Sequence, residues 1–228
     1  MGMTAEGREV IRIGAEAIVS RLTWNGFKLI SKYRVPKPYR MPELDRWIRD
    51  RRTLHEAKVL HEAKKRDVRC PAVVLIDRSR SEIYMTEIEG KELKKCLGEL
   101  PVRKVGELAS QLGEMVAKMH ISGIAHGDLT TSNIIMDQEG RLYLVDFGLS
   151  SFTDEVEDLA VDIHLLDRSL ESMHTEVREE FMRSFLKRYS EVAGREFTMK
   201  IMRKVKEIRM RGRYVEERRR EVRNSYNQ

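Results

Sequence analysis

Residues His126–Asn133, followed by Asp146-Phe147-Gly148, constrain this chain more than any other part of its sequence. They place an aspartate, an asparagine five residues later and a second aspartate within 19 positions. A phosphoryl-transfer site has this spacing: Asp128 accepts the proton of an attacking hydroxyl or orients it, and Asn133 and Asp146 hold Mg²⁺ on the phosphates of ATP. An Asx-rich loop explains any one of these triplets, but the combined spacing favours the phosphoryl-transfer site.

The first 90 residues are typical of a small β-rich region with one helix. Asn25-Gly26 is a strong signal for a two-residue hairpin. Three prolines, at positions 36, 38 and 42, break the next stretch into a loop. A charged helix is expected over 43–65, because its few apolar residues have helical spacing. Strands are expected over 10–13, 18–22, 27–33, 72–76 and 82–88.

The rest of the chain is predicted to be mostly helical. Helices are expected over about 105–119, 156–174, 176–193 and 198–220, and Gly123 is a candidate left-handed cap of the first of them. A β-hairpin is expected over 133–145, so Asn133 begins it and Asp146 follows it; a hairpin is a rigid way to hold two ligands of one metal site. The sequence therefore predicts an α+β chain with an N-terminal region, residues 1–88, and a C-terminal region, residues 89–228.

Charge and cysteine content limit the classes of function. Residues 201–228 hold ten Lys or Arg and four Glu, whereas the other 200 residues hold 33 charges of each sign. This basic tail either contacts the phosphates of a nucleic acid or is a solvated helix with internal ion pairs. Cys70 and Cys96 form no metal or disulfide pattern, and the longest apolar run, 72–76, is too short for a membrane span. We expect a cytoplasmic protein without membrane contact.

The strand over 27–33 supplies a candidate phosphate-binding lysine. Strand alternation puts Ile30 and Lys32 on one face, where an apolar wall for adenine would lie next to a phosphate contact. Lys28 shares that face, so periodicity alone does not select Lys32. A phosphate-binding lysine needs a carboxylate to fix its position, and the charged helix offers Glu56, with Glu62 as the competing choice.

Two further segments are candidate contacts of ATP. The turn Gly14-Ala15-Glu16-Ala17 has one glycine where a glycine-rich phosphate loop has three, so a plain hairpin turn is the alternative. The segment 84–90 is placed to link the two regions, and its backbone at Glu87 and Ile88 either bonds adenine or is a plain linker. The candidate ATP-binding residues are Ile13, Gly14, Ala15, Glu16, Ala17, Val19, Ile30, Lys32, Met85, Glu87 and Ile88.

The sequence lacks the parts that dock a substrate peptide in standard protein kinases. Pro101 is the last proline, so no Ala-Pro-Glu motif follows Asp146. Asp162, on the next predicted helix, lies only 16 residues beyond Asp146. A long activation loop does not fit into that interval, so regulation by its phosphorylation is not expected.

Together these segments resemble the PRPK family, the small atypical protein kinases that form the kinase subunit of the KEOPS complex. The resemblance covers nearly the whole chain. One departure lies in the basic tail, where Arg211-Gly212-Arg213 is followed by Tyr214-Val215 and not by more basic residues. The segments that carry the resemblance are Gly14–Ala17, Lys32–Arg40, Arg51-Arg52-Thr53 with Glu56-Ala57, His126–Asn133 and Glu157–Asp162.

The resemblance implies a minimal bilobal protein-kinase-like fold that uses ATP and Mg²⁺, phosphorylates itself on Ser or Thr, and hydrolyses ATP when bound to partners. It makes Asp128 the proton acceptor, Asn133 and Asp146 the magnesium ligands, and Lys32 the phosphate contact paired with Glu56. The implied partners are the threonylcarbamoyl-transferase subunit of KEOPS and a small KEOPS subunit. That complex makes threonylcarbamoyladenosine in tRNAs that read codons beginning with adenosine.

Three other functions remain open at this point. A small-molecule phosphotransferase of the aminoglycoside or choline type also uses His-Gly-Asp, but it needs a larger helical region than the 100 residues that follow Asp128. A RIO-like ribosome-assembly kinase is the second alternative, and the Gly14–Ala17 and Lys32–Arg40 segments favour the PRPK family over both. The third is a tRNA-binding module without catalysis, and the complete set of one lysine, two aspartates and one asparagine argues against it.

Overall fold

The computed structural model describes the backbone of residues 6–225 and the side chains of residues 7–211. Contacts divide the chain into two compact units. The first unit contains residues 1–93 and 132–150, and the second contains residues 94–131 and 151–228. Strands dominate the first unit and helices the second, which confirms the predicted α+β fold class.

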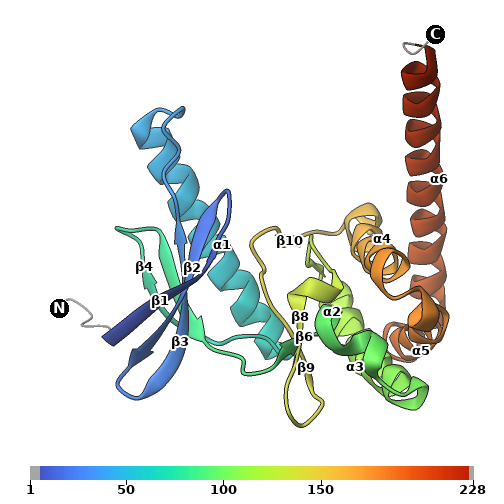
Figure 1. Cartoon of the computed structure of the whole chain (residues 1–228), viewed down its shortest axis with the longest axis horizontal. Helices are drawn as coiled ribbons and strands as arrows, with labels where there is room; N and C mark the ends of the chain where they lie inside the picture. The colour runs from blue at the N-terminus through green and yellow to red at the C-terminus, as the bar shows by residue number, and fades with distance from the viewer. Residues whose placement is uncertain (1–5, 226–228) are drawn as a thin grey trace. The chain divides into compact units, whose positions relative to one another are not determined.

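A five-stranded antiparallel sheet and one long helix form most of the first unit (Figure 1). The strands lie in the order β1-β2-β3-β5-β4, and the helix α1 contacts β4 and β5. The predicted hairpin at Asn25-Gly26 is confirmed, with φ angles of 49° and 80°. The bounds are β1 (Glu6–Ile13), β2 (Ala17–Trp24), β3 (Phe27–Arg34), α1 (Pro42–Lys65), β4 (Val73–Asp77) and β5 (Glu82–Thr86).

Helix α1 buries charged residues as well as apolar ones. Pro42 opens the helix, where its missing N–H group is not needed. Acidic residues lie in the first turn and lysines in the last, which favours the helix dipole. The buried residues include Asp45 and Glu56. This is why the apolar periodicity of the segment is weak although the helix is long.

A smaller three-stranded sheet joins residues 132–150 to the first unit. Its strands β6 (Lys91–Glu92), β8 (Ile134–Met136) and β9 (Leu142–Leu144) lie in the order β6-β8-β9. The N–H group of Leu144 also donates to the carbonyl of Arg69 at 2.9 Å. The predicted hairpin is present, but Asn133 lies just before it, in the short 3-10 turn η2 (Thr131–Asn133). These non-local pairings group the hairpin with residues 1–93, which the predicted boundary at 88/89 did not anticipate.

The second unit consists mainly of four long helices (Figure 1). Helix α3 packs along α5, and α4 contacts both α5 and α6. Two two-residue strands, β7 (Ile124–Ala125) and β10 (Ser151–Phe152), pair antiparallel and are too short to leave a periodic signal. The bounds of the helices are α2 (Leu93–Cys96), η1 (Leu97–Glu99), α3 (Val102–Ile121), α4 (Val156–Met173), α5 (Thr175–Ala193) and α6 (Arg195–Ser225).

The predicted apolar face of α3 is the core of the second unit. Val105, Leu108, Leu112, Val116 and Met119 are all buried. Beyond the helix, Gly123 has a φ of 67° and its N–H group bonds the carbonyl of His120, so the predicted left-handed cap is confirmed. No helix in residues 6–225 is long and apolar enough to cross a membrane.

Gly113 lets α3 and α5 approach at backbone distance. A Cβ atom at this position would lie 2.4 Å from the carbonyl oxygen of Phe185 and 3.2 Å from the amide nitrogen of Tyr189. Backbone atoms in the middle of a helix cannot move aside locally, so any side chain here pushes the two helices apart. Glycine costs helix stability at this position but sets the spacing of the core.

We expect Gly113→Ala to lower the free energy of unfolding by about 2 kcal/mol, because overpacking strain exceeds the gain in helix propensity. Gly106→Ala on the same helix is the matched control, because its Cβ would meet only side-chain atoms of Glu180 and Ser184. Urea unfolding followed by circular dichroism measures both. Equal stability of the two variants would contradict a backbone contact at Gly113.

Candidate active site

Lys32 lies in the first unit between two carboxylates. Its Nζ atom is 2.7 Å from Oε1 of Glu56 on α1 and 2.7 Å from Oδ1 of Asp146, which follows β9. Lys32 is only 9 % exposed, whereas Lys28 on the same face of β3 is exposed and pairs with Glu89. Burial therefore distinguishes two lysines that strand periodicity could not.

Glu56 is shared by two cations from the same strand. Its other oxygen, Oε2, lies 2.6 Å from the guanidinium of Arg34, which is also buried. Burial outweighs the attraction of Glu56 and lowers the pKa of Arg34. The competing candidate, Glu62, points instead to Lys65 one turn along the helix. Of the two glutamates considered, Glu56 is the one in contact with Lys32.

The segment after β9 carries a carboxylate that a magnesium site could use. Asp146 has a φ of 62°, and its carboxylate is partly exposed beside Lys32. A Cβ on Gly148 would lie 2.8 Å from Nζ of Lys32, so a side chain there would displace the lysine ammonium. The N–H group of Val145 bonds the carbonyl of Asn133 at 3.0 Å, which ties the two candidate ligands together. Carboxylate and amide oxygens are ligands that suit Mg²⁺.

Four of the candidate ATP-binding residues share one face of the large sheet. Val19 lies opposite Lys32 in the β2–β3 ladder, and Ile30 lies opposite Met85 in the β3–β5 ladder. Directly opposed residues point to the same face. Val19, Ile30 and Met85 therefore form an apolar surface beside the Lys32 ammonium, the arrangement that the sequence predicted for a base next to a phosphate contact.

The turn between β1 and β2 is held by two basic side chains. The N–H group of Gly14 bonds the carbonyl of Ala17 at 2.9 Å. Lys37 Nζ donates to the carbonyl of Ala15, and Arg52 on α1 forms an ion pair with Glu16 at 2.5 Å. The turn is thus fixed by side chains from the two basic segments that accompany it in the sequence resemblance. Ile13 ends the strand before this turn and is exposed.

The segment after β5 offers fewer backbone groups to adenine than the sequence suggests. The N–H group of Glu87 donates to the carbonyl of Lys28 at 3.2 Å, so it is engaged within the sheet. The side chain of Glu87 accepts a hydrogen bond from Arg21 at 2.7 Å. The adenine contact predicted here is therefore left to the carbonyl of Glu87 and the backbone of Ile88.

The loop that carries Asp128 belongs to the second unit and is held by a buried carboxylate. Asp162 on α4 is fully buried. Its Oδ2 accepts the N–H group of His126 at 2.6 Å, and its Oδ1 accepts the N–H group of Gly127 at 2.8 Å. The N–H group of Asp128 lies 3.4 Å from Nδ1 of His126, so this histidine braces the loop. Gly127 has a φ of 78°, which glycine adopts without strain.

Asp162 also contacts the buried ring of His120, which in turn contacts Tyr189. Nε2 of His120 on α3 lies 3.2 Å from its Oδ2, and Nδ1 of the same ring lies 2.9 Å from the hydroxyl of Tyr189 on α5. Burial raises the pKa of the Tyr189 phenol, so it keeps its proton. The three long helices α3, α4 and α5 thus meet at one polar chain inside the second unit.

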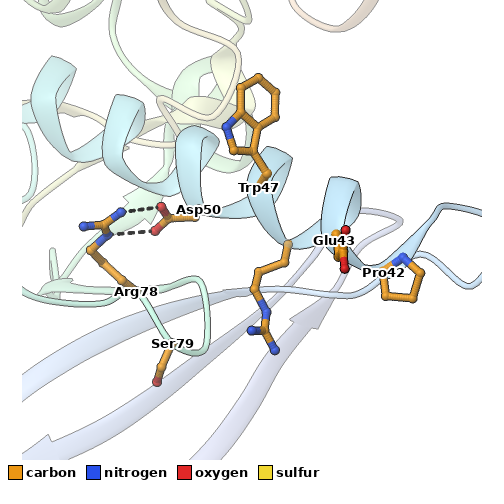
Figure 2. Close-up of a pocket in the computed structure, with 7 residues that line it drawn as sticks. Pro42, Glu43, Trp47, Asp50, Arg78 and Ser79 are labelled. Carbon is orange, nitrogen blue, oxygen red and sulfur yellow. Dashed lines mark hydrogen bonds and ion pairs between the residues drawn. The ribbon is translucent and has the colours of Figure 1, made fainter.

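Two surface cavities on α1 lie apart from these residues. The larger, of about 650 Å³, is lined by residues of α1 and of the β4–β5 turn, and Arg78 donates two hydrogen bonds to Asp50 beside it (Figure 2). The other, of about 590 Å³, touches the predicted site only at Gly148. The candidate ATP-binding residues line neither cavity.

Cys70 lines neither cavity and is not one of the candidate site residues. Burial raises the pKa of its thiol to about 11, which makes it a poor nucleophile.

The sequence did not predict the residues that contact Glu56 and Asp162, apart from Lys32 and the Asp128 loop. Arg34 follows Ile30 and Lys32 at the strand period, so alternation places it on the same face. The signal was available, but an arginine in a strand is normally solvated. His120 and Tyr189 gave no signal, because in a helix they fit an ordinary buried face. Only the packing of three helices brings them to Asp162.

We expect Glu56→Ala to lower the free energy of unfolding by about 3–5 kcal/mol, because it leaves the buried Arg34 guanidinium without its counter-charge. Glu62→Ala on the same helix is the matched control and should leave stability unchanged, because Glu62 forms only an i,i+3 pair with Lys65. Chemical denaturation monitored by Trp fluorescence compares the two. Equal loss of stability in both variants would contradict the central position of Glu56.

The sequence has identifiable relatives among known proteins. Residues 35–166, more than half of the chain, match the family described as the protein kinase domain. The KEOPS complex subunit Bud32 of Pyrococcus abyssi is 41% identical over 153 residues, which cover 67% of this chain and 69% of that relative.

Two longer relatives are named probable bifunctional tRNA threonylcarbamoyladenosine biosynthesis proteins. The one from Methanothermobacter thermautotrophicus is 36% identical over 208 residues, and the one from Methanobrevibacter smithii is 38% identical over 206 residues. The matches cover 91% and 90% of this chain but only 37% of each relative. The buried lysine–glutamate pair, the Asp128 loop and these matches lead to one assignment: the chain belongs to the protein kinase family and, within it, to the Bud32/PRPK group.

Proposed function

We propose that this chain is an ATP-dependent serine/threonine kinase and ATPase that works as a subunit of a KEOPS complex. The observation that carries the proposal is the Lys32 ammonium, which is buried between Glu56 and Asp146 at 2.7 Å from each. Such a lysine is oriented before a nucleotide arrives, and orientation accounts for most of the catalysis in phosphoryl transfer.

The candidate site residues have three roles in the proposed phosphoryl transfer: phosphate binding, metal binding and acceptance of a proton. Mg²⁺ and ATP, when bound, supply the phosphoryl group and neutralise its charge. Lys32 binds phosphate oxygens, and Glu56 keeps its ammonium in place. Asn133 and Asp146 hold the metal. Asp128, on the loop fixed by Asp162, accepts the proton of the attacking hydroxyl of a Ser, a Thr or water.

The assembly and its product are proposed from the relatives' names. One relative is a KEOPS subunit, and others are bifunctional proteins of threonylcarbamoyladenosine synthesis in tRNA. The bifunctional relatives are much longer than their match to this chain. We propose that this chain works with the threonylcarbamoyl-transferase subunit of KEOPS and a small KEOPS subunit, and that the assembly modifies tRNA.

The structure describes the side chains of the basic helix α6 up to Arg211. In the described part, Lys204, Arg209 and Arg211 form ion pairs with acidic residues of α4, so these cations stabilise the packing of α6 on α4. The tRNA contact predicted for the tail therefore rests mainly on residues 212–228, whose side chains lie outside the described residues.

Asp128→Ala and Asp146→Ala are each expected to abolish ATP turnover without unfolding the protein, because one removes the proton acceptor and the other a metal ligand. Release of phosphate from ATP, measured with and without the transferase partner, checks this. Lys28→Ala is the matched control, because Lys28 shares the strand face of Lys32 but is exposed, and it should keep full turnover. Wild-type turnover in either aspartate variant would contradict the assigned roles.

Removal of residues 212–228 is expected to weaken tRNA binding more at low than at high salt, because the segment carries five arginines and phosphate contacts weaken as salt rises. A full-length variant with these arginines changed to glutamine separates charge from helix length. Titration of labelled tRNA at both salt concentrations measures the effect. Equal affinities of the truncated and intact chains at both would show that the tail makes no phosphate contact.

A further inference from the structure

The second unit contains a continuous chain of buried polar groups that the proposed chemistry does not use. It runs from the Tyr189 hydroxyl through His120 to Asp162, with heavy-atom distances of 2.9 Å and 3.2 Å. The exposed fractions of the three residues are 0, 2 and 0 %. Polar groups buried this deeply lower stability unless every one is hydrogen-bonded. We therefore ask which role this series of hydrogen bonds has in the protein.

The positions of the protons in the chain follow from what each group can do. A carboxylate oxygen accepts, so the hydrogen bond to Asp162 requires a proton on Nε2 of His120. The bare Nδ1 atom then accepts the hydroxyl proton of Tyr189. The phenol thereby favours the same tautomer of His120, and it is the last donor of this series of hydrogen bonds.

Asp162 is the point at which this chain reaches the loop of Asp128. Its two oxygens accept the N–H groups of His126 and Gly127 as well as that of His120. With three donors from two segments, the carboxylate is locked in one orientation. If the proton of His120 were on Nδ1 instead, a bare Nε2 would face the carboxylate and repel it, and Asp162 would hold the loop less tightly.

We propose that Tyr189 is a positioning residue for the loop that carries Asp128, and that it stabilises the conformation of this loop through His120 and Asp162. This inference rests on the proposed function, because the loop carries Asp128. Tyr189 lies on α5, and no part of it belongs to the proposed ATP or metal site. The close approach of α3 and α5 at Gly113, two turns before His120 on α3, is what brings the phenol within hydrogen-bond distance of the imidazole.

Tyr189→Phe is the sharpest test, because it removes one oxygen and keeps the ring. The expected result is a kcat for ATP turnover about fivefold lower, as for the loss of one buried hydrogen bond. The KM for ATP should stay within about twofold, because the proposed nucleotide contacts lie in the other unit. Phe185→Leu is the matched control: Phe185 stacks on Tyr189 with ring centroids 5.9 Å apart, so it loosens the same packing but leaves the hydroxyl. It should keep the wild-type kcat.

A double-mutant cycle tests the path of the effect. In a His120→Leu background, Tyr189→Phe should cause no further loss of kcat, because the intermediary is already absent. An equal fivefold loss in both backgrounds would overturn the proposal, and so would a wild-type kcat for Tyr189→Phe alone. A loss of kcat in Phe185→Leu as large as in Tyr189→Phe would also overturn it, because packing would then explain both.

Amide hydrogen exchange distinguishes a failure of this inference from a failure of the proposed function. Without any nucleotide, the N–H group of Gly127 should exchange faster in Tyr189→Phe than in the wild type and in Phe185→Leu. Unchanged exchange would refute the positioning role whatever the enzyme does. If the wild-type protein hydrolysed no ATP with its partner present, the proposed function would fail, but faster exchange would still support the link from Tyr189 to the loop.

Discussion

A fully buried carboxylate must be neutralised or hydrogen-bonded, and this requirement organises each compact unit of the protein. Among the buried carboxylates of the first unit, Glu56, which is 1 % exposed, is the one that pairs with Lys32. In the second unit, Asp162 is fully buried. A charge left alone in either place would cost several kcal/mol. Each carboxylate therefore fixes the elements that carry its partners: β3 against α1 around Glu56, and α3 and the Asp128 loop against α4 around Asp162.

The two carboxylates serve the proposed chemistry in different ways. Glu56 holds a cation, Lys32, at the place where phosphate charge is expected to arrive. Asp162 holds backbone N–H groups, and so it determines the shape of a loop and not the position of a charge. Both depend on glycine at the point of contact, because Gly148 leaves room for the Lys32 ammonium and Gly127 adopts a positive φ in the loop. Lys32 and the loop of Asp128 are thus held in place by Glu56 and Asp162, which do not themselves react in the proposed chemistry.

Much of this arrangement could be predicted from the sequence, and the exceptions have physical reasons. The long helices, the Asn25-Gly26 hairpin and the hairpin after Asn133 are encoded locally, by periodicity and turn residues. The choice of Lys32 over Lys28 is not, because the two lysines share one face of the strand. The choice of Glu56 over Glu62 is not either, because the apolar periodicity of α1 is too weak to show which face of the helix is buried. Burial by distant segments decides both.

The roles of Arg34 and Tyr189 also depend on segments that are distant in the sequence. Arg34 looks like a solvated strand arginine until α1 covers it with Glu56. Tyr189 looks like one more apolar contact of α5 until the spacing set at Gly113 places its hydroxyl on His120. The two-residue strands β6, β7 and β10 are too short for any pattern, and they form only because longer elements bring their backbones together.

Lys32, Asn133 and Asp146 are proposed to form one nucleotide–metal site in which a carboxylate fixes the lysine. A crystal structure of the protein with Mg²⁺ and a non-hydrolysable ATP analogue would show whether they do. We expect Asn133 and Asp146 as metal ligands, Lys32 on the phosphates and still paired with Glu56, and the base against Val19, Ile30 and Met85. A nucleotide bound elsewhere, or a metal held without Asp146, would contradict this expectation.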